Sequence, residues 1–203
     1  MLFNNSDELC QHVADISDGL CILSFSGGKD SLACWLQLQK YFDRIIPFYM
    51  YLVPGLSFVE QGLSYYEDVF KTRIIRLPHP SLYRMLNNFT FQAPENCQVI
   101  ADLALPNFDY DDLYRVIKED YSLPDNVYTA LGVRAVDSPN RWAAMKKYGP
   151  LNEKRQVFYP IYDWRKAQLM GAINQAGSKL PPDYVLLCLA VPSMGLTIVS
   201  WSR

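Results

Sequence analysis

The segment whose residue types most clearly suggest a binding site is a short glycine-containing loop near the start of the chain: Ser24-Phe25-Ser26-Gly27-Gly28-Lys29-Asp30-Ser31. Adjacent glycines let backbone N–H groups approach an anion closely. If the loop opens a helix, the unpaired first N–H groups of that helix and the positive end of its dipole add to the attraction. Lys29 supplies a mobile positive charge, and the hydroxyls of Ser26 and Ser31 are hydrogen-bond donors. These features predict a binding site for nucleotide phosphates; the alternative is an ordinary tight turn.

Asp30 needs a separate explanation, because a carboxylate repels a bare phosphate. It either caps the following helix or holds Mg²⁺, which prefers carboxylate and phosphate oxygens. Further along, Arg134 and Arg141 carry planar guanidinium groups that suit phosphate, sulfate or carboxylate oxygens. The alternative for each is a solvated surface charge; we expect ligand contact for Arg134 and leave Arg141 open. Gly132, just before them, lets the backbone pass close to a ligand.

The flanking segments predict the elements that position these residues. The apolar run 19–25 is typical of a buried parallel strand, and 31–42 reads as a helix. We expect further strands at 45–53, 73–77, 126–131 and 157–161, and further helices at 6–17, 58–70, 81–88, 109–121, 141–148 and 164–175. Ser6 and Asp163 are the expected N-caps of the first and last of these helices. This order predicts an α/β fold: a three-layer, doubly wound, mainly parallel sheet with helices on both faces, of the Rossmann-like type.

We expect a single domain over residues 1–203 with a core at about 18–180. Residues 81–124 are expected to form an irregular insertion in which 89–107 is mostly loop. A C-terminal segment, 181–203, contains an apolar stretch at 184–191 that is expected to be buried.

The composition narrows the class of protein. There are 19 Lys and Arg against 21 Asp and Glu, so the net charge of −2 does not indicate a nucleic-acid partner. No apolar run reaches the roughly 18 residues that span a bilayer, and no secretory signal pattern is visible, so we expect a cytoplasmic protein with no membrane partner. The five cysteines include no C-x-x-C pair, which predicts free thiols and neither a zinc site nor an iron–sulfur cluster.

Three motifs resemble those of known families. Residues 26–31 do not match the Walker A pattern, in which two glycines are separated by four residues and followed by Lys and Ser or Thr. They resemble the PP-loop, S-G-G-x-D-S, of the N-type ATP pyrophosphatases. Segment 132–141, GVRAVDSPNR, looks like the G-x-R-x-x-D/E-S-x-x-R segment of the phosphoadenylyl-sulfate (PAPS) reductase family, and 159–164, YPIYDW, looks like that family's P-I/L-x-D-W. The three motifs occur in the family's order over about residues 20 to 180.

The resemblance implies an adenine nucleotide alpha hydrolase-like fold that binds ATP, or PAPS as an alternative, with Mg²⁺ on Asp30. It implies that the adenine lies against the end of the second strand, near Tyr49 and Met50, where the alternative is that these residues belong to the core. The catalytic candidates are Lys29, Asp30 and Arg134. The nucleotide-binding candidates are Ser24, Ser26, Gly27, Gly28, Lys29, Asp30, Ser31, Tyr49, Met50, Gly55, Gly132, Arg134 and Arg141.

The chain departs from the sulfonucleotide reductases, which act through a cysteine in an E-C-G-x-H-like tail. The one late cysteine, Cys188, lies among aliphatic residues, where a thiol is a poor nucleophile. We therefore expect cleavage of ATP between its α and β phosphates, with activation of an unknown second substrate as an adenylate. The alternatives are a reductase that uses a partner's thiol and a non-catalytic nucleotide-binding module that works with a companion protein. A homodimer remains open.

Overall fold

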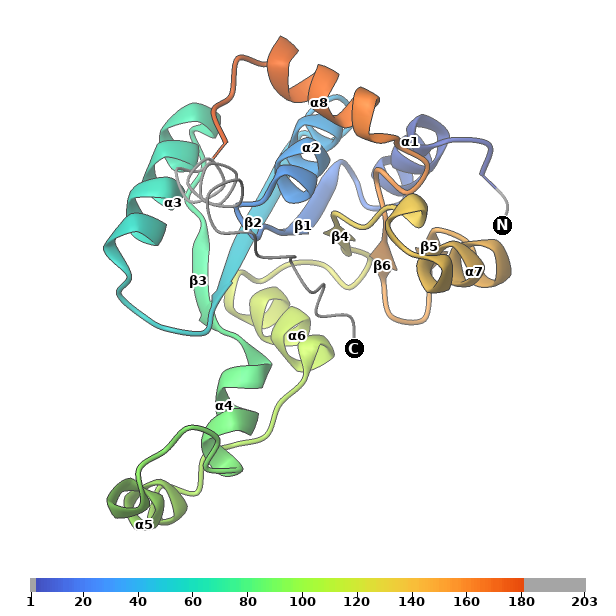
Figure 1. Ribbon diagram of the computed structural model, residues 1–203. Helices are drawn as coiled ribbons and strands as arrows, with labels where there is room; N and C mark the ends of the chain where they lie inside the picture. The colour runs from blue at the N-terminus through green and yellow to red at the C-terminus, as the bar shows by residue number, and fades with distance from the viewer. Residues whose placement is uncertain (1–2, 181–203) are drawn as a thin grey trace.

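The structure, a computed structural model, describes residues 3–180 and has a central sheet between two layers of helices (Figure 1). Its strands are β1 (Leu20–Ser24), β2 (Arg44–Tyr51), β3 (Ile75–Pro78), β4 (Tyr128–Leu131), β5 (Leu151–Asn152) and β6 (Val157–Phe158). Its helices are α1 (Ser6–Ile16), α2 (Lys29–Leu38), α3 (Ser57–Phe70), α4 (Pro80–Asn87), α5 (Pro94–Asp102), α6 (Tyr110–Asp120), α7 (Pro139–Tyr148) and α8 (Lys166–Gln175), with a 3₁₀ turn, η1, at Ala135–Asp137.

The sheet has the order β3-β2-β1-β4-β6-β5. Strands β3, β2, β1, β4 and β6 run parallel, and the two-residue edge strand β5 runs antiparallel to β6. The chain moves outward from β1 to β3 and then returns to form β4 on the other side of β1. This order confirms the predicted doubly wound, mainly parallel sheet.

Alternate residues of the strands face two separate cores, as the two-residue period of a strand requires. On β1, Cys21 and Leu23 lie in the core that α1, α2, α3 and α8 cover, whereas Ile22 lies in the core that α6 covers. In the first core Trp35 packs edge-on against Phe25, with ring centroids 4.9 Å apart, and stacks on Phe70 at 4.1 Å. Helices therefore cover both faces of the sheet, as predicted.

Both predicted helix caps are wrong. Helix α1 begins after Asn5, whose side chain accepts a hydrogen bond from the Glu8 N–H, and α8 begins after Arg165. Asp163 instead accepts hydrogen bonds from the backbone N–H and the hydroxyl of Ser6. Because these two residues are far apart in sequence, their bond ties the start of α1 to the segment before α8.

Within the predicted insertion, the helices expected at 81–88 and 109–121 are confirmed as α4 and α6, and only the expected loop between them is wrong. Residues 81–124 contain α4, α5 and α6, and α5 occupies the middle of the segment expected to be loop. Helix α6 packs on the sheet, while α4 and α5 extend away from it (Figure 1). No residue of α5 is buried, and the helix has only nine residues, which is shorter than the window in which a helical period is recognised.

The expected burial of 184–191 concerns residues outside those that the structure describes. Within residues 3–180, none of the helices combines the length and the apolar character that crossing a membrane requires.

Candidate functional site

The glycine-containing loop lies where the winding of the sheet reverses. It follows β1, and the segment that contains Gly132 and Arg134 follows β4, the neighbour of β1. The loop leaves the carboxyl end of β1, and the segment with Gly132 leaves the carboxyl end of β4. From β1 the chain continues toward one edge of the sheet, and from β4 it continues toward the other edge. In open α/β sheets, this crevice is where ligands bind.

The loop has the backbone that anion binding needs. Gly27 has a φ of +76°, in the left-handed region that favours glycine. Gly28 is the N-cap of α2, and no side chain caps this helix end, so the first N–H groups of α2 are left for an external partner. The hydroxyls of Ser26 and Ser31 are used within the loop: Ser26 donates to Ser31 (3.1 Å), and Ser31 donates to the Gly28 carbonyl (2.9 Å). These two hydrogen bonds stabilise the conformation of the loop.

Two cations of the predicted site converge on Asp30. The Lys29 ammonium lies 2.6 Å from Asp30 Oδ2, and Arg134 Nε lies 2.8 Å from Asp30 Oδ1. The Arg134 side chain is only 7% exposed, so the interpretation as a solvated surface charge is wrong. Asp30 does not cap α2, although its charge in the first turn suits the helix dipole. The structure thus brings all three candidate catalytic residues together.

Asp30 Oδ1 and Arg134 Nε share a further property. They are within ion-pair distance, yet neither of these buried atoms has a hydrogen-bond partner among residues 3–180. Native structures leave few buried polar atoms without a hydrogen bond, and a bound ion, water or ligand is a common partner of such atoms. These two atoms are therefore paired by charge but not by a well-aligned hydrogen bond.

Asp137 is a site residue that sequence analysis missed. Its Oδ1 lies 2.7 Å from Arg134 Nη2 and its Oδ2 lies 3.0 Å from Arg141 Nη1. One carboxylate thus joins both arginines, and a chain of ion pairs runs from Lys29 to Arg141. Its spacing could have indicated this role, because Asp137 lies three residues after Arg134 and four before Arg141, distances that bring side chains together in a helical segment. Ser138 caps α7 through a bond to the Arg141 N–H (3.2 Å), which fixes the helix that carries Arg141.

Gly132 makes a close contact with the loop. A Cβ at this position would lie 2.9 Å from the Asp30 carbonyl oxygen and 3.0 Å from both the Asp30 carbonyl carbon and the Ser31 nitrogen. The close approach that needs a glycine is therefore to the first turn of α2. This contact holds the segment after β4 directly against the loop.

The adenine-binding candidates lie at the same edge of the sheet but do not share one face. Ser24, the last residue of β1, is in register with Phe48, so Tyr49 and Met50 extend just past the end of β1. Tyr49 packs with the core on the α2 side and Met50 with the core on the α6 side. Gly55, with a φ of +73°, lies in the exposed turn between β2 and α3. A ligand on one face of the sheet can therefore contact Tyr49 or Met50, but not both.

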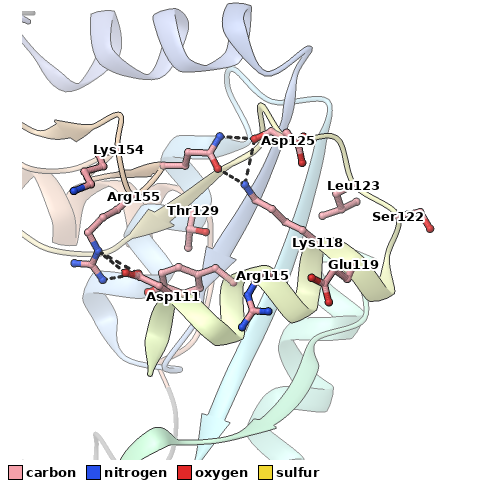
Figure 2. Close-up of a pocket in the computed structure, with 12 residues that line it drawn as sticks. Asp111, Arg115, Lys118, Glu119, Ser122, Leu123, Asp125, Thr129, Lys154 and Arg155 are labelled. Atoms are coloured by element: carbon pink, nitrogen blue, oxygen red, sulfur yellow. Dashed lines mark hydrogen bonds and ion pairs between the residues drawn. The ribbon is translucent and has the colours of Figure 1, made fainter. Parts of the chain in front are cut away.

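A cavity of about 680 Å³ lies elsewhere, between α6 and the β5–β6 hairpin (Figure 2). Two of its basic side chains are held by polar neighbours in the lining: Arg155 binds Asp111, with Nη2 2.6 Å from Oδ1, and the Lys118 ammonium donates to Gln156 Oε1 (2.5 Å). Burial lowers the pKa of Lys118. Asp125 and Gln156 precede β4 and β6, so this cavity lies toward the amino ends of those strands, away from the loop.

A second cavity, of about 660 Å³, adjoins the candidate site. It lies between α7 and the ends of β4 and β5, and its lining includes Arg141 and Val133, the residue before Arg134. The chain of ion pairs therefore connects this cavity with the loop.

The described residues offer no complete metal cage. Among residues 3–180, no group of three or more His, Cys, Asp or Glu side chains is arranged to hold a metal ion. A cation at this site would need phosphate oxygens and water besides Asp30, which is the way Mg²⁺ is commonly held at nucleotide sites.

Comparisons with known proteins add a limited result. No protein-family model matches the chain, and no curated protein matches it. Among solved structures, the chain is similar to the U34-tRNA thiolase NcsA from Methanococcus maripaludis with its 4Fe–4S cluster, with a TM-score of 0.49 and 10% identity over 86% of this chain and 63% of that chain. It is also similar to a predicted subunit of a tRNA methyltransferase from Methanocaldococcus jannaschii, with a TM-score of 0.37 and 15% identity over 88% of this chain and 90% of that chain. The chain spans less than two thirds of the thiolase's length, and both TM-scores are below 0.5, so no activity or partner follows from either similarity.

Proposed function

We propose that the chain binds ATP together with Mg²⁺ at the loop, cleaves the nucleotide between its α and β phosphates, and transfers the adenylyl group to an acceptor. The observation that carries the proposal is the convergence of Lys29 and Arg134 on the uncapped start of α2, at the point where the winding of the sheet reverses. The choice of the α–β bond rests on the resemblance of residues 26–31 to the PP-loop of the ATP pyrophosphatases.

In the proposed reaction, an oxygen of the acceptor forms a bond to the α phosphorus. The bond from this phosphorus to the bridging oxygen breaks, and pyrophosphate leaves with the electron pair. The N–H groups at the start of α2 and the Lys29 ammonium are placed to stabilise the negative charge that develops on the leaving group. Arg134, which ion pairs hold on two sides, is placed to orient a phosphate through its remaining donors.

Asp30 explains why a metal ion belongs in the proposal. Three cations (Lys29, Arg134 and Arg141) are joined to two carboxylates, so the cluster keeps only about one net positive charge for a ligand with several negative charges. Asp30 has a buried oxygen that is held by the ion pair with Arg134 but by no well-aligned hydrogen bond among the described residues, and carboxylate plus phosphate oxygens are what Mg²⁺ prefers. When bound, Mg²⁺ would neutralise phosphate charge. Asp30 would exchange its two cationic partners for the metal, which frees Lys29 and Arg134 to contact phosphate.

Buried thiols argue against a reductase that relies on the described cysteines. Burial raises the pKa of Cys10 to about 12 and raises the pKa values of Cys21 and Cys34 well above the ordinary value, and the thiolate is the reactive form. Cys97 is partly exposed, but it lies on α5, which extends away from the sheet (Figure 1). Cys188 lies outside the described residues.

The difference in burial predicts which thiols react. Treatment of the folded protein with iodoacetamide is expected to modify Cys97 and to leave Cys10, Cys21 and Cys34 unmodified, as measured by mass spectrometry of peptides. In urea all four are expected to react, which provides the control. Modification of Cys21 or Cys34 in the folded protein at the rate of Cys97 would show that these thiols are accessible and would reopen the reductase alternative.

The proposed reaction is tested by product analysis with the Lys29→Ala variant. Wild-type protein with ATP, Mg²⁺ and a mixture of candidate acceptors is expected to release AMP or an adenylate together with pyrophosphate. The variant is expected to lose about 100-fold to 1,000-fold in rate, the cost of removing one donor that acts on transition-state charge. Release of ADP and phosphate would contradict the proposal. ATP binding without turnover would favour a nucleotide-binding module instead.

A further inference from the structure

The cavity beside Arg141 has an apolar wall that the fold leaves uncovered. One face of α7 lines it, formed by Arg141, Ala144, Met145 and Tyr148 at positions that adjoin on a helix. The opposite wall comes from the sheet and the start of the turn after β5: Leu131, Val133, Leu151 and Tyr159 are apolar or aromatic, and Asn152 and Glu153 are polar. No residue of α7 is buried, and Tyr148 is 71% exposed, so the space between α7 and the sheet is open to a ligand. The apolar part of this lining suits an apolar or aromatic body.

Arg141 and Glu153 are the charged residues of this lining, and Arg141 is the one that can pair with an anion. Its Nη1 pairs with Asp137 Oδ2 at 3.0 Å, and no other ion pair involves this side chain within residues 3–180. A guanidinium has five N–H donors, so Arg141 can also bind a carboxylate while it keeps Asp137. Half of the side chain is exposed, which leaves it accessible to a ligand in the cavity.

The position of the cavity connects Arg141 to the loop. Val133 lines the cavity, and the next residue, Arg134, pairs with Asp30 in the loop. Asp137 joins Arg134 to Arg141 through contacts of 2.7 and 3.0 Å. A ligand on Arg141 is therefore held by the same chain of ion pairs that is proposed to bind the nucleotide.

We propose that this cavity is the acceptor site and that the acceptor is a carboxylic acid with an apolar or aromatic body, whose carboxylate pairs with Arg141. The inference rests on the proposed function and names the substrate class. A carboxylate oxygen forms the bond to the α phosphorus, the bond to the bridging oxygen breaks, and pyrophosphate leaves with the electron pair, which yields an acyl adenylate. A carboxylic acid is ionised at neutral pH, so this step transfers no proton and needs no general base.

The proposal is tested by ligand-observed NMR with 3-phenylpropionate as the probe and 3-phenylpropanamide as its uncharged match. The acid is expected to bind the wild-type protein, and the amide is expected to bind about tenfold more weakly, since a hydrogen bond to a charged group contributes roughly that factor. Arg141→Gln is expected to remove the preference. Equal binding of acid and amide to the wild-type protein would overturn the proposal.

Two further variants locate the bound probe. Ala144→Trp puts a large side chain into the cavity, whereas Ala143→Trp alters an exposed neighbour on α7 that does not line it. Only the first is expected to weaken binding of the acid, and an equal effect of both would contradict the location. ATP binding is measured in the same samples by calorimetry. ATP binding without acid binding overturns this inference alone, whereas acid binding without ATP binding overturns the proposed function and the acceptor role with it.

Discussion

Replacement of Arg134 by glutamine is expected to lower the free energy of unfolding by about 3 kcal/mol and to abolish ATP binding. Removing one partner of a buried ion pair costs about 3–5 kcal/mol because the other charge stays buried without compensation. The lower end of this range applies, since Asp30 keeps Lys29 and Asp137 keeps Arg141. ATP binding is lost because the variant removes the guanidinium that pairs with both Asp30 and Asp137 beside the loop. Urea unfolding and calorimetry with ATP and Mg²⁺ measure the two effects.

Arg141→Gln is the matched control for stability. It removes the same chemical group from the same carboxylate, Asp137, but at a side chain that is 50% exposed rather than 7%. Exposed ion pairs contribute about 0–1 kcal/mol, so the expected change in unfolding free energy is below about 1 kcal/mol. If the two variants were equally stable, the burial of Arg134 would have no energetic consequence and the description of the site as a buried ion-pair cluster would be wrong.

Replacement of Gly132 by alanine is expected to weaken ATP binding by at least tenfold and to lower the free energy of unfolding by about 1–3 kcal/mol, the range for overpacking a close contact. The added Cβ would lie 2.9–3.0 Å from backbone atoms of Asp30 and Ser31, which cannot move aside as a flexible side chain can. The first turn of α2 must shift, and with it the N–H groups proposed to bind phosphate. Small displacements of positioned groups have large effects on binding and rate.

Gly62→Ala provides the comparison. Gly62 lies within α3, and a Cβ built there meets no atom within 4 Å, so alanine is expected to raise stability by about 0.5–1 kcal/mol through its better helix propensity. ATP affinity is expected to stay unchanged, because α3 does not contact the loop through this residue. Wild-type ATP affinity in Gly132→Ala would show that the contact between the segment after β4 and α2 does not position the site.

The sequence predicted those elements whose signal is local. Strand β1 and helix α2 were recognisable because a run of apolar residues meets a pair of glycines and then a helical period, all within about twenty residues. Helix α5 was missed because it is only nine residues long and none of them is buried, so its helical period is too short to stand out. The Ser6 cap was wrong because Asn5, its equally suitable neighbour, caps the helix while Ser6 binds Asp163.

The loop from Ser26 to Ser31 was determined by the sequence alone, since glycine conformation, helix start and charge type act over adjacent residues. The partners of its charged side chains were decided by the tertiary structure. Asp30 pairs with Arg134 only because β4 returns to lie beside β1, and Gly132 is needed only because that return brings two backbones together. An ion pair requires two charges within a few ångströms of each other, and for residues on different strands that distance is set by the order of the strands in the sheet.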